Sequence, residues 1–106
     1  MIYSDFQGKK LSQLGFGTMR LPRINPDESK IDDVPAKAIL DHALANGINY
    51  IDTARGYGQS EVRLGEAFKE LGIREKLIVS SKIIRRELDQ FKADFETTMS
   101  NLQTDY

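Results

Sequence analysis

Apolar runs of strand type alternate along this chain with amphipathic helical runs, and this alternation restricts the possible folds more than any other feature. Residues 48–52 and 77–81 are the clearest strand-type runs, and residues 14–17 form a shorter one. Strands that alternate with helices are typical of βαβ units, whose strands lie parallel in one sheet. We therefore predict an α/β fold with a parallel sheet.

The helical runs are marked by apolar residues that recur at the 3.6-residue period of one helix face. They cover residues 35–46, residues 60–71 and a third segment that begins near Leu88. We expect Ser60 to cap the second helix, because a serine oxygen at a helix start accepts hydrogen bonds from free N–H groups. The third run carries the most regular apolar stripe in the chain, which predicts core packing. The stripe consists of Phe91, Phe95, Met99 and Leu102.

The segments outside these units have patterns of their own. Residues 1–12 predict a small hairpin with its turn at Gln7-Gly8. Residues 22–33 contain prolines and several charges, and we interpret them as a surface loop and not as a linker between domains. The chain is therefore interpreted as a single segment, residues 1–106, which is one domain or a piece of one.

Charge balance and residue usage exclude several classes of protein. The chain has 15 Lys and Arg residues, 16 Asp and Glu residues and a formal net charge of −1, so no broad basic surface for nucleic acid is expected. No apolar run reaches the roughly 18 residues of a membrane span, so no membrane partner is expected. The absence of cysteine excludes disulfides and cysteine-ligated metals from this segment, and no metal site is predicted. The first residues lack the pattern of a signal peptide, and we expect a cytoplasmic protein.

Two ionisable residues stand where predicted strands end. Asp52 ends the run 48–52, and Lys82 directly follows the run 77–81. Functional groups of parallel α/β folds gather at the carboxyl ends of the strands, so we expect both side chains at one end of the sheet. Tyr57 lies in a glycine-flanked loop shortly after Asp52, and its hydroxyl can reach the same end.

These three side chains could together donate a proton. A phenol is a poor acid–base catalyst near neutral pH, but a nearby ammonium such as that of Lys82 favours the phenolate. Asp52 could hold the ammonium by a charge-assisted hydrogen bond. The combination suits a carbonyl oxygen that gains negative charge during reduction. Spacing alone also allows a structural interpretation, in which Asp52 caps a loop, Tyr57 packs and Lys82 is solvated.

Residues 15–20 are similar to half of a dinucleotide-binding fingerprint. Gly15 and Gly17 fit the first two glycines of G-x-G-x-x-G, but Arg20 occupies the place of the third. Pro22 also interrupts the passage from strand to helix that the motif requires. The sequence therefore argues against a Rossmann-type site.

Taken in order, the motifs resemble those of the aldo-keto reductases. Residues 14–22 are similar to the opening strand motif of that family. Residues 47–54, followed by residues 56–58, 60–61 and 64–67, closely resemble its second signature. Residues 74–82 resemble the strand that delivers the active-site lysine. The likeness covers nearly the whole chain after the first ten residues.

The resemblance implies a (β/α)8 barrel closed at its base by a hairpin, of which this chain would hold the hairpin and about three βα units. It also implies reduction of aldehydes and ketones with NADPH, so the partner would be a small carbonyl substrate. Tyr57 would be the proton donor, Lys82 the cation that favours its phenolate, and Asp52 the residue that fixes Lys82. The cofactor would be contacted near its nicotinamide end by Gly17, Thr18, Met19 and Asp52.

An eight-unit barrel needs about 250 residues, so the chain would be roughly two-fifths of one. The family's active-site histidine normally follows the fourth strand, and His42 lies on the wrong element to match it. We therefore expect negligible turnover from this N-terminal portion alone. Its open sheet edges would invite self-association. The alternative is a non-catalytic binding or regulatory subunit of the same fold, like the potassium-channel β-subunits.

Overall fold

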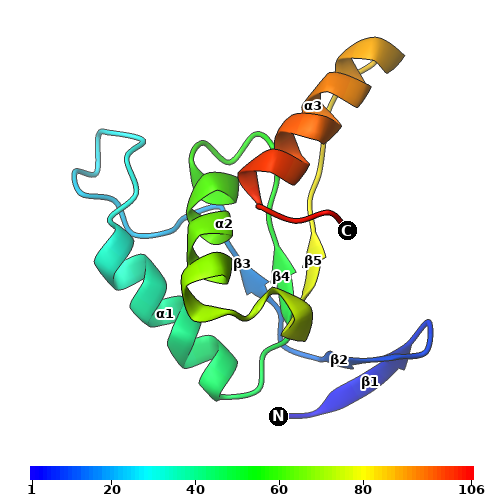
Figure 1. Cartoon of the computed structure of the whole chain (residues 1–106). Coiled ribbons are helices and arrows are strands. Elements are labelled where there is room, and N and C mark those ends of the chain that lie inside the picture. Colours follow the sequence, from blue (N-terminus) through cyan, green and yellow to red (C-terminus); the bar gives the residue numbers. More distant parts are fainter.

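Three parallel strands, each followed by a helix, form the centre of the molecule (Figure 1). The computed structural model describes all residues from 1 to 106. The elements in chain order are β1 (Tyr3–Phe6), β2 (Lys9–Ser12), β3 (Phe16–Gly17), α1 (Asp33–Ala45), β4 (Tyr50–Asp52), α2 (Ser60–Leu71), a 3-10 turn (Arg74–Lys76), β5 (Ile78–Ser80) and α3 (Leu88–Asn101). The α/β fold with a parallel sheet is confirmed.

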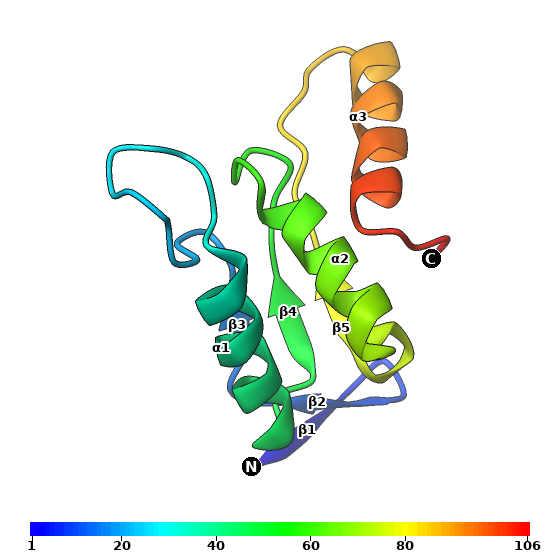
Figure 2. The ribbon, with the colours of Figure 1, turned by 60° about the vertical axis from the view of Figure 1, so that its left-hand side comes forward.

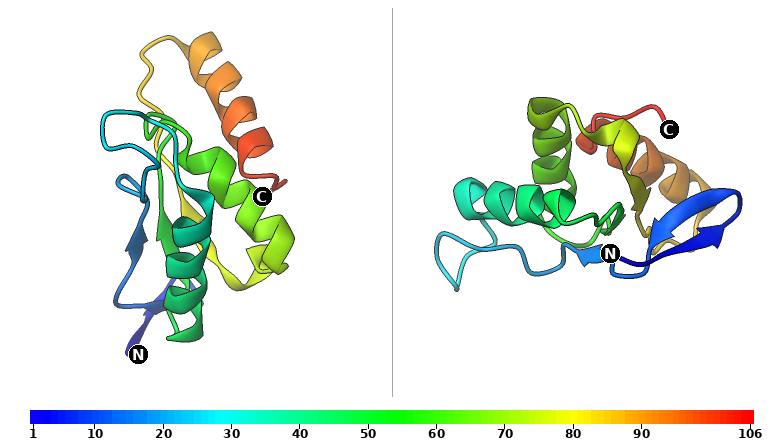
Figure 3. Two further views of the ribbon diagram at one scale, coloured as in Figure 1. Left: turned by 90° about the vertical axis from the view of Figure 1, so that its left-hand side faces the viewer. Right: turned by 90° about the horizontal axis from the view of Figure 1, so that it is seen from below.

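The central sheet has the strand order β3-β4-β5, so consecutive strands are neighbours. Gly17 pairs with Asp52, and Asp52 pairs with Ser80, which brings the carboxyl ends of the three strands to the same level. The three helices lie on one side of this sheet, as the two turned views show (Figures 2 and 3). Because β3 and β5 are the outer strands, each leaves one edge without a further strand of this chain.

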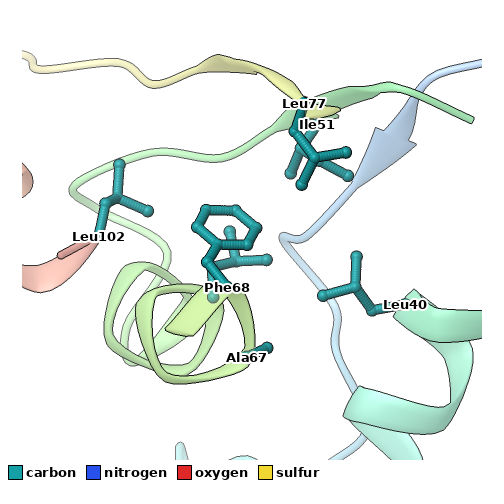
Figure 4. Packing of buried hydrophobic residues seen from close by; sticks show 7 residues of the cluster. Leu40, Ile51, Ala67, Phe68, Leu77 and Leu102 are labelled. Atoms are coloured by element: carbon teal, nitrogen blue, oxygen red, sulfur yellow. The ribbon is translucent and has the colours of Figure 1, made fainter. Parts of the chain in front are cut away.

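The main core fills the space between the sheet and the helices α1 and α2 (Figure 4). Ile51 at the centre of β4 is fully buried, and Leu64 and Phe68 on one face of α2 are 2% exposed. Burial of such side chains stabilises the fold by about 25 cal/mol for each Å² of apolar surface removed from water. The complete cluster is Leu40, Ile51, Leu64, Ala67, Phe68, Leu77 and Leu102.

The strands β1 and β2 form the antiparallel hairpin that the first twelve residues predict. Its turn places Gln7 and Gly8 at positive φ, which is the backbone conformation of a tight hairpin turn. The Tyr3 hydroxyl donates to the carbonyl oxygen of Gly47 at 2.8 Å, and the backbone N–H of Ser12 donates to the side chain of Asn49 at 2.8 Å. Because Gly47 and Asn49 directly precede β4, the hairpin lies at the amino ends of the strands.

Two details of the sequence interpretation are wrong. Ser60 is not the cap of α2: Gln59 precedes the helix, and the Ser60 hydroxyl donates instead to the carbonyl oxygen of Thr18 at 2.7 Å. The apolar stripe of α3 is core only at its C-terminal end, because Leu102 is 4% exposed and belongs to the main core, whereas Phe91 and Phe95 are 40% and 46% exposed.

The reason for the second error is the way α3 meets the rest of the chain. Its C-terminal end packs on α2 and buries Leu102, whereas its first turns extend beyond β5 and past the N-terminal end of α2 (Figure 1). There Phe91 and Phe95 border an open apolar groove beside β5. None of the three helices is long and apolar enough to cross a membrane.

Candidate active site

Asp52 and Lys82 meet at the carboxyl ends of the central strands. Asp52 is the last residue of β4, and Lys82 lies two residues beyond β5. The Lys82 ammonium donates to both carboxylate oxygens of Asp52, at 2.8 Å to Oδ1 and 2.7 Å to Oδ2, and to the carbonyl oxygen of Thr53 at 2.8 Å. Three hydrogen bonds thus fix the position of one positive charge.

The loop between β4 and α2 brings Tyr57 to the same charge. Two successive turns shape this loop: the Tyr57 N–H donates to the carbonyl oxygen of Ala54, and the Ser60 N–H donates to that of Tyr57, both at 3.1 Å. Gly58 follows with a positive φ of 58°, a conformation that glycine adopts without strain. The Lys82 Nζ lies 5.1 Å from the centroid of the Tyr57 ring. The structure therefore brings together the three side chains that the strand ends predict.

The charge distribution around Lys82 stabilises its protonated form. The hydrogen bond with Asp52 is the main cause that raises the pKa of Lys82 above its ordinary value of 10.5. Partial burial acts in the opposite direction, and the neighbouring Tyr57 adds a smaller upward effect. The side chains of Lys82 and Asp52 are 44% and 38% exposed, so water screens much of this interaction. At neutral pH the lysine is a fixed cation beside the phenol.

The segment after β3 lies next to the same carboxylate-bearing strand. Gly17 pairs with Asp52 in the sheet. Thr18 is fully buried, and both its N–H and its hydroxyl donate to the carbonyl oxygen of Asp52, at 3.0 and 3.1 Å. Met19, by contrast, is 59% exposed. Thr18 therefore holds β3 against β4, while Met19 presents an apolar side chain at the surface.

A cavity of about 480 Å³ opens beside these groups. Met19, Tyr57 and Lys82 border it, together with two arginines that the sequence interpretation did not include in the site. Arg85 is paired with Asp94 at 2.5 Å. Arg55 has a buried Nε without a hydrogen-bond partner. A loop arginine two positions before the tyrosine was the available signal for Arg55.

The sequence interpretation also missed two further groups that shape the candidate site. The carbonyl oxygen of Thr53, which accepts from the Lys82 ammonium, is a backbone atom, so its contact cannot be predicted from the residue type. Glu61 is buried in the first turn of α2. Its spacing to Leu64 and Phe68 places a carboxylate on the apolar face of the helix, which was a readable signal. No group of His, Asp and Glu side chains in the chain is arranged to hold a metal ion.

Comparison with known proteins identifies relatives along most of the chain. The family model "Aldo/keto reductase family" matches residues 13–106. Protein tas from Escherichia coli K12 is 37% identical over 83 residues, which cover 70% of this chain and 22% of that protein. The aldo-keto reductase YhdN from Bacillus subtilis is 30% identical over 115 aligned residues, which cover 93% of this chain and 33% of YhdN.

Comparison with a solved structure also shows similarity to an aldo-keto reductase. The aldo-keto reductase AKR11C1 from Bacillus halodurans, in its holo form, superimposes with a TM-score of 0.74 and 32% sequence identity. The match covers 93% of this chain and 35% of that chain. This chain therefore spans a third or less of the curated relatives described above, and its three βα units form a partial barrel. YhdN and AKR11C1 are both named aldo-keto reductases, so these matches do not favour the alternative of a non-catalytic subunit.

Proposed function

The chain belongs to the aldo/keto reductase family, a family of oxidoreductases, and on that premise we propose that it carries the proton-donating part of an NADPH-dependent carbonyl reductase. The substrate would be a small aldehyde or ketone. The main observation in favour is the Lys82 ammonium, which is held by Asp52 and Thr53 and lies 5.1 Å from the centroid of the Tyr57 ring.

In this proposal Tyr57 donates the proton of its hydroxyl to the carbonyl oxygen of the substrate. Negative charge develops on that oxygen as the carbonyl is reduced, and a positioned acid neutralises it. The phenolate left behind is stabilised by the Lys82 ammonium. Asp52 and the Thr53 carbonyl keep this ammonium in place without taking its proton, because they also stabilise its charged form.

The residues along β3 suit the nicotinamide end of the cofactor. The cavity of about 480 Å³ beside Tyr57 and Lys82 has room for a nicotinamide ring and a small carbonyl compound, and Met19 offers it an apolar wall. Gly17, which has no side chain, leaves space for close approach, and Thr18 and Asp52 hold this segment to β4. Bound NADPH would supply the hydride.

We expect the 106-residue chain by itself to have negligible turnover. It covers 35% of the matched structure, so most of the barrel wall that would enclose cofactor and substrate belongs to other units. An enclosed, water-excluding site is what makes fixed charges effective in catalysis. The activity is therefore proposed for a complete barrel that contains these residues.

The direct test is reduction of small aldehydes and ketones by the whole protein, followed as consumption of NADPH. We expect turnover with at least one aldehyde, and no turnover when the carbonyl compound is omitted. The Lys82→Met variant removes the ammonium but keeps a side chain of similar length, and we expect it to lose most of the rate. Full activity of Lys82→Met would contradict the proposed role of the cation.

A further inference from the structure

Glu61 is a carboxylate buried in the first turn of α2 without any cationic partner. Glu61 is only 1% exposed. None of the ion pairs in the chain involves it. A buried carboxylate is costly unless hydrogen bonds satisfy its oxygens, so its presence on an apolar helix face requires an explanation.

Three neutral donors from two other elements satisfy Glu61. Its Oε1 accepts hydrogen bonds from the hydroxyls of Ser81, at 2.8 Å, and Thr98, at 2.9 Å. Its Oε2 accepts from the side-chain amide of Asn101 at 3.3 Å. The N-terminal end of α2 adds the favourable field of the helix dipole. One carboxylate thus joins α2, the segment after β5 and the C-terminal half of α3.

The segment joined through Ser81 is the one that carries Lys82. The backbone after β5 remains extended: the Thr53 N–H donates to the Ser80 carbonyl oxygen at 2.8 Å and the Arg55 N–H to that of Lys82 at 2.9 Å. Side chains alternate along such a segment. Ser81 and Ile83 accordingly border the groove against α3, whereas Lys82 and Ile84 border the cavity with Tyr57.

The residue before Glu61 makes an equivalent contact on the other side. The Ser60 hydroxyl donates to the carbonyl oxygen of Thr18 at 2.7 Å, and Thr18 continues β3. The first turn of α2 therefore contacts the carboxyl ends of both outer strands through adjacent residues. Tyr57 stands in the loop that leads directly into this turn.

We propose that Glu61 is a positioning residue for the candidate active site: through Ser81 it fixes the backbone that presents Lys82 to Asp52 and Tyr57. The inference rests on the proposed function for its catalytic consequence, but its geometric part concerns Lys82 alone. Glu61 touches neither Lys82 nor the cavity, so it acts only through its neighbours. Its contacts to Thr98 and Asn101 hold α3 and are separable from this role.

Two single substitutions separate the two roles. Ser81→Ala removes the hydroxyl that links Glu61 to the Lys82 segment, and Thr98→Val removes a hydroxyl at nearly the same distance from the same oxygen. Each leaves the other hydroxyl to satisfy Oε1. The primary readout is solvent exchange of the Lys82 ammonium protons at neutral pH, measured by nitrogen-15 NMR on the purified protein. Hydrogen-bonded protons exchange slowly because their bonds must open first.

We expect Ser81→Ala to accelerate this exchange about tenfold, which corresponds to about 1.4 kcal/mol, and Thr98→Val to leave it unchanged. Thermal unfolding should show similar losses of stability for both variants. In the whole protein, Ser81→Ala should lower kcat with little change in KM, and Thr98→Val should leave both unchanged. Equal effects of the two variants on the Lys82 exchange, or no effect of either, would overturn the proposal.

Glu61→Gln provides the conservative replacement. Its amide oxygen can still accept from Ser81 and Thr98, so slow exchange of the Lys82 ammonium should be retained, whereas Glu61→Ala should lose it. Fast exchange in Glu61→Gln would contradict positioning by this acceptor. Because the exchange readout needs no turnover, a failure of the proposed reductase activity would leave this outcome unaffected and is distinguishable from it.

Discussion

Replacing Gly65 by alanine tests how α2 and α3 are joined, because two principles predict opposite signs for its effect. Gly65 lies inside α2, where alanine is intrinsically favoured over glycine by about 1 kcal/mol. At this position, however, an added Cβ would lie 2.0 Å from the carbonyl oxygen of Asn101 and 2.9 Å from the carbonyl carbon of Leu102. Helix propensity predicts stabilisation, and the packing predicts destabilisation.

The magnitude follows from what must move. The obstructing atoms belong to the backbone at the end of α3, so no side-chain rotation relieves the clash, and overpacking of this kind costs about 1–3 kcal/mol. Moving α3 away also loosens the packing of Leu102, which is 4% exposed, and burial of a leucine is worth about 1.5–3 kcal/mol. After subtraction of the propensity gain, we expect a net loss of about 2 kcal/mol in the free energy of unfolding.

Urea unfolding followed by circular dichroism measures this difference directly. Gly56→Ala is the matched control, because a Cβ at Gly56 would meet no atom within 4 Å. The control should leave the free energy of unfolding unchanged or raise it by a few tenths of a kcal/mol (about 0.4) through the stiffer unfolded chain. A Gly65→Ala variant as stable as the unsubstituted protein, or more stable, would refute the close contact between the two helices.

Three further predictions concern stability and association. Because Asp52 raises the pKa of Lys82 above 10.5, the folded state holds the Lys82 proton more tightly than the unfolded state. The small stabilisation from this pair should therefore persist below pH 10.5 and disappear as the pH rises through the raised pKa. Asp52→Asn should remove this alkaline decline in the free energy of unfolding. Leu102→Ala should cost about 2–4 kcal/mol in urea unfolding, whereas Phe95→Ala, at a residue that is 46% exposed, should cost less than about 1 kcal/mol; equal costs would contradict the observed packing of α3. The open edges of β3 and β5 predict self-association of the 106-residue chain, and elution as a compact monomer in size-exclusion chromatography would count against it.

Local patterns were sufficient to predict the elements and the meeting of Asp52 with Lys82. Alternation of apolar runs and helical periodicity determines which segments can be strands or helices, and parallel pairing of consecutive strands brings their carboxyl ends together. The position of Tyr57 followed from the short loop between β4 and α2.

Contacts between distant segments were not predictable in the same way. The stripe of Phe91 and Phe95 shows that these residues share a face, but it contains no information on what lies opposite, and in this chain both remain 40% or more exposed. Ser60 illustrates a similar limit, because its hydroxyl does not cap the helix. It donates instead to the carbonyl oxygen of Thr18, 42 positions earlier in the sequence. The hydrogen bonds of Glu61 could be predicted only from the relative positions of α2, α3 and the segment after β5.

The most direct test of the account compares Tyr57→Phe with Tyr106→Phe in the whole protein, with NADPH and the best aldehyde substrate. Both substitutions remove one phenolic hydroxyl, but Tyr106 lies over Arg74 and makes no hydrogen bond through its hydroxyl. General-acid catalysis is typically worth about 10²–10⁴ in rate, so Tyr57→Phe should lower kcat by at least about a hundredfold, while Tyr106→Phe should leave it unchanged. An undiminished kcat for Tyr57→Phe would contradict the central claim that this phenol donates the proton.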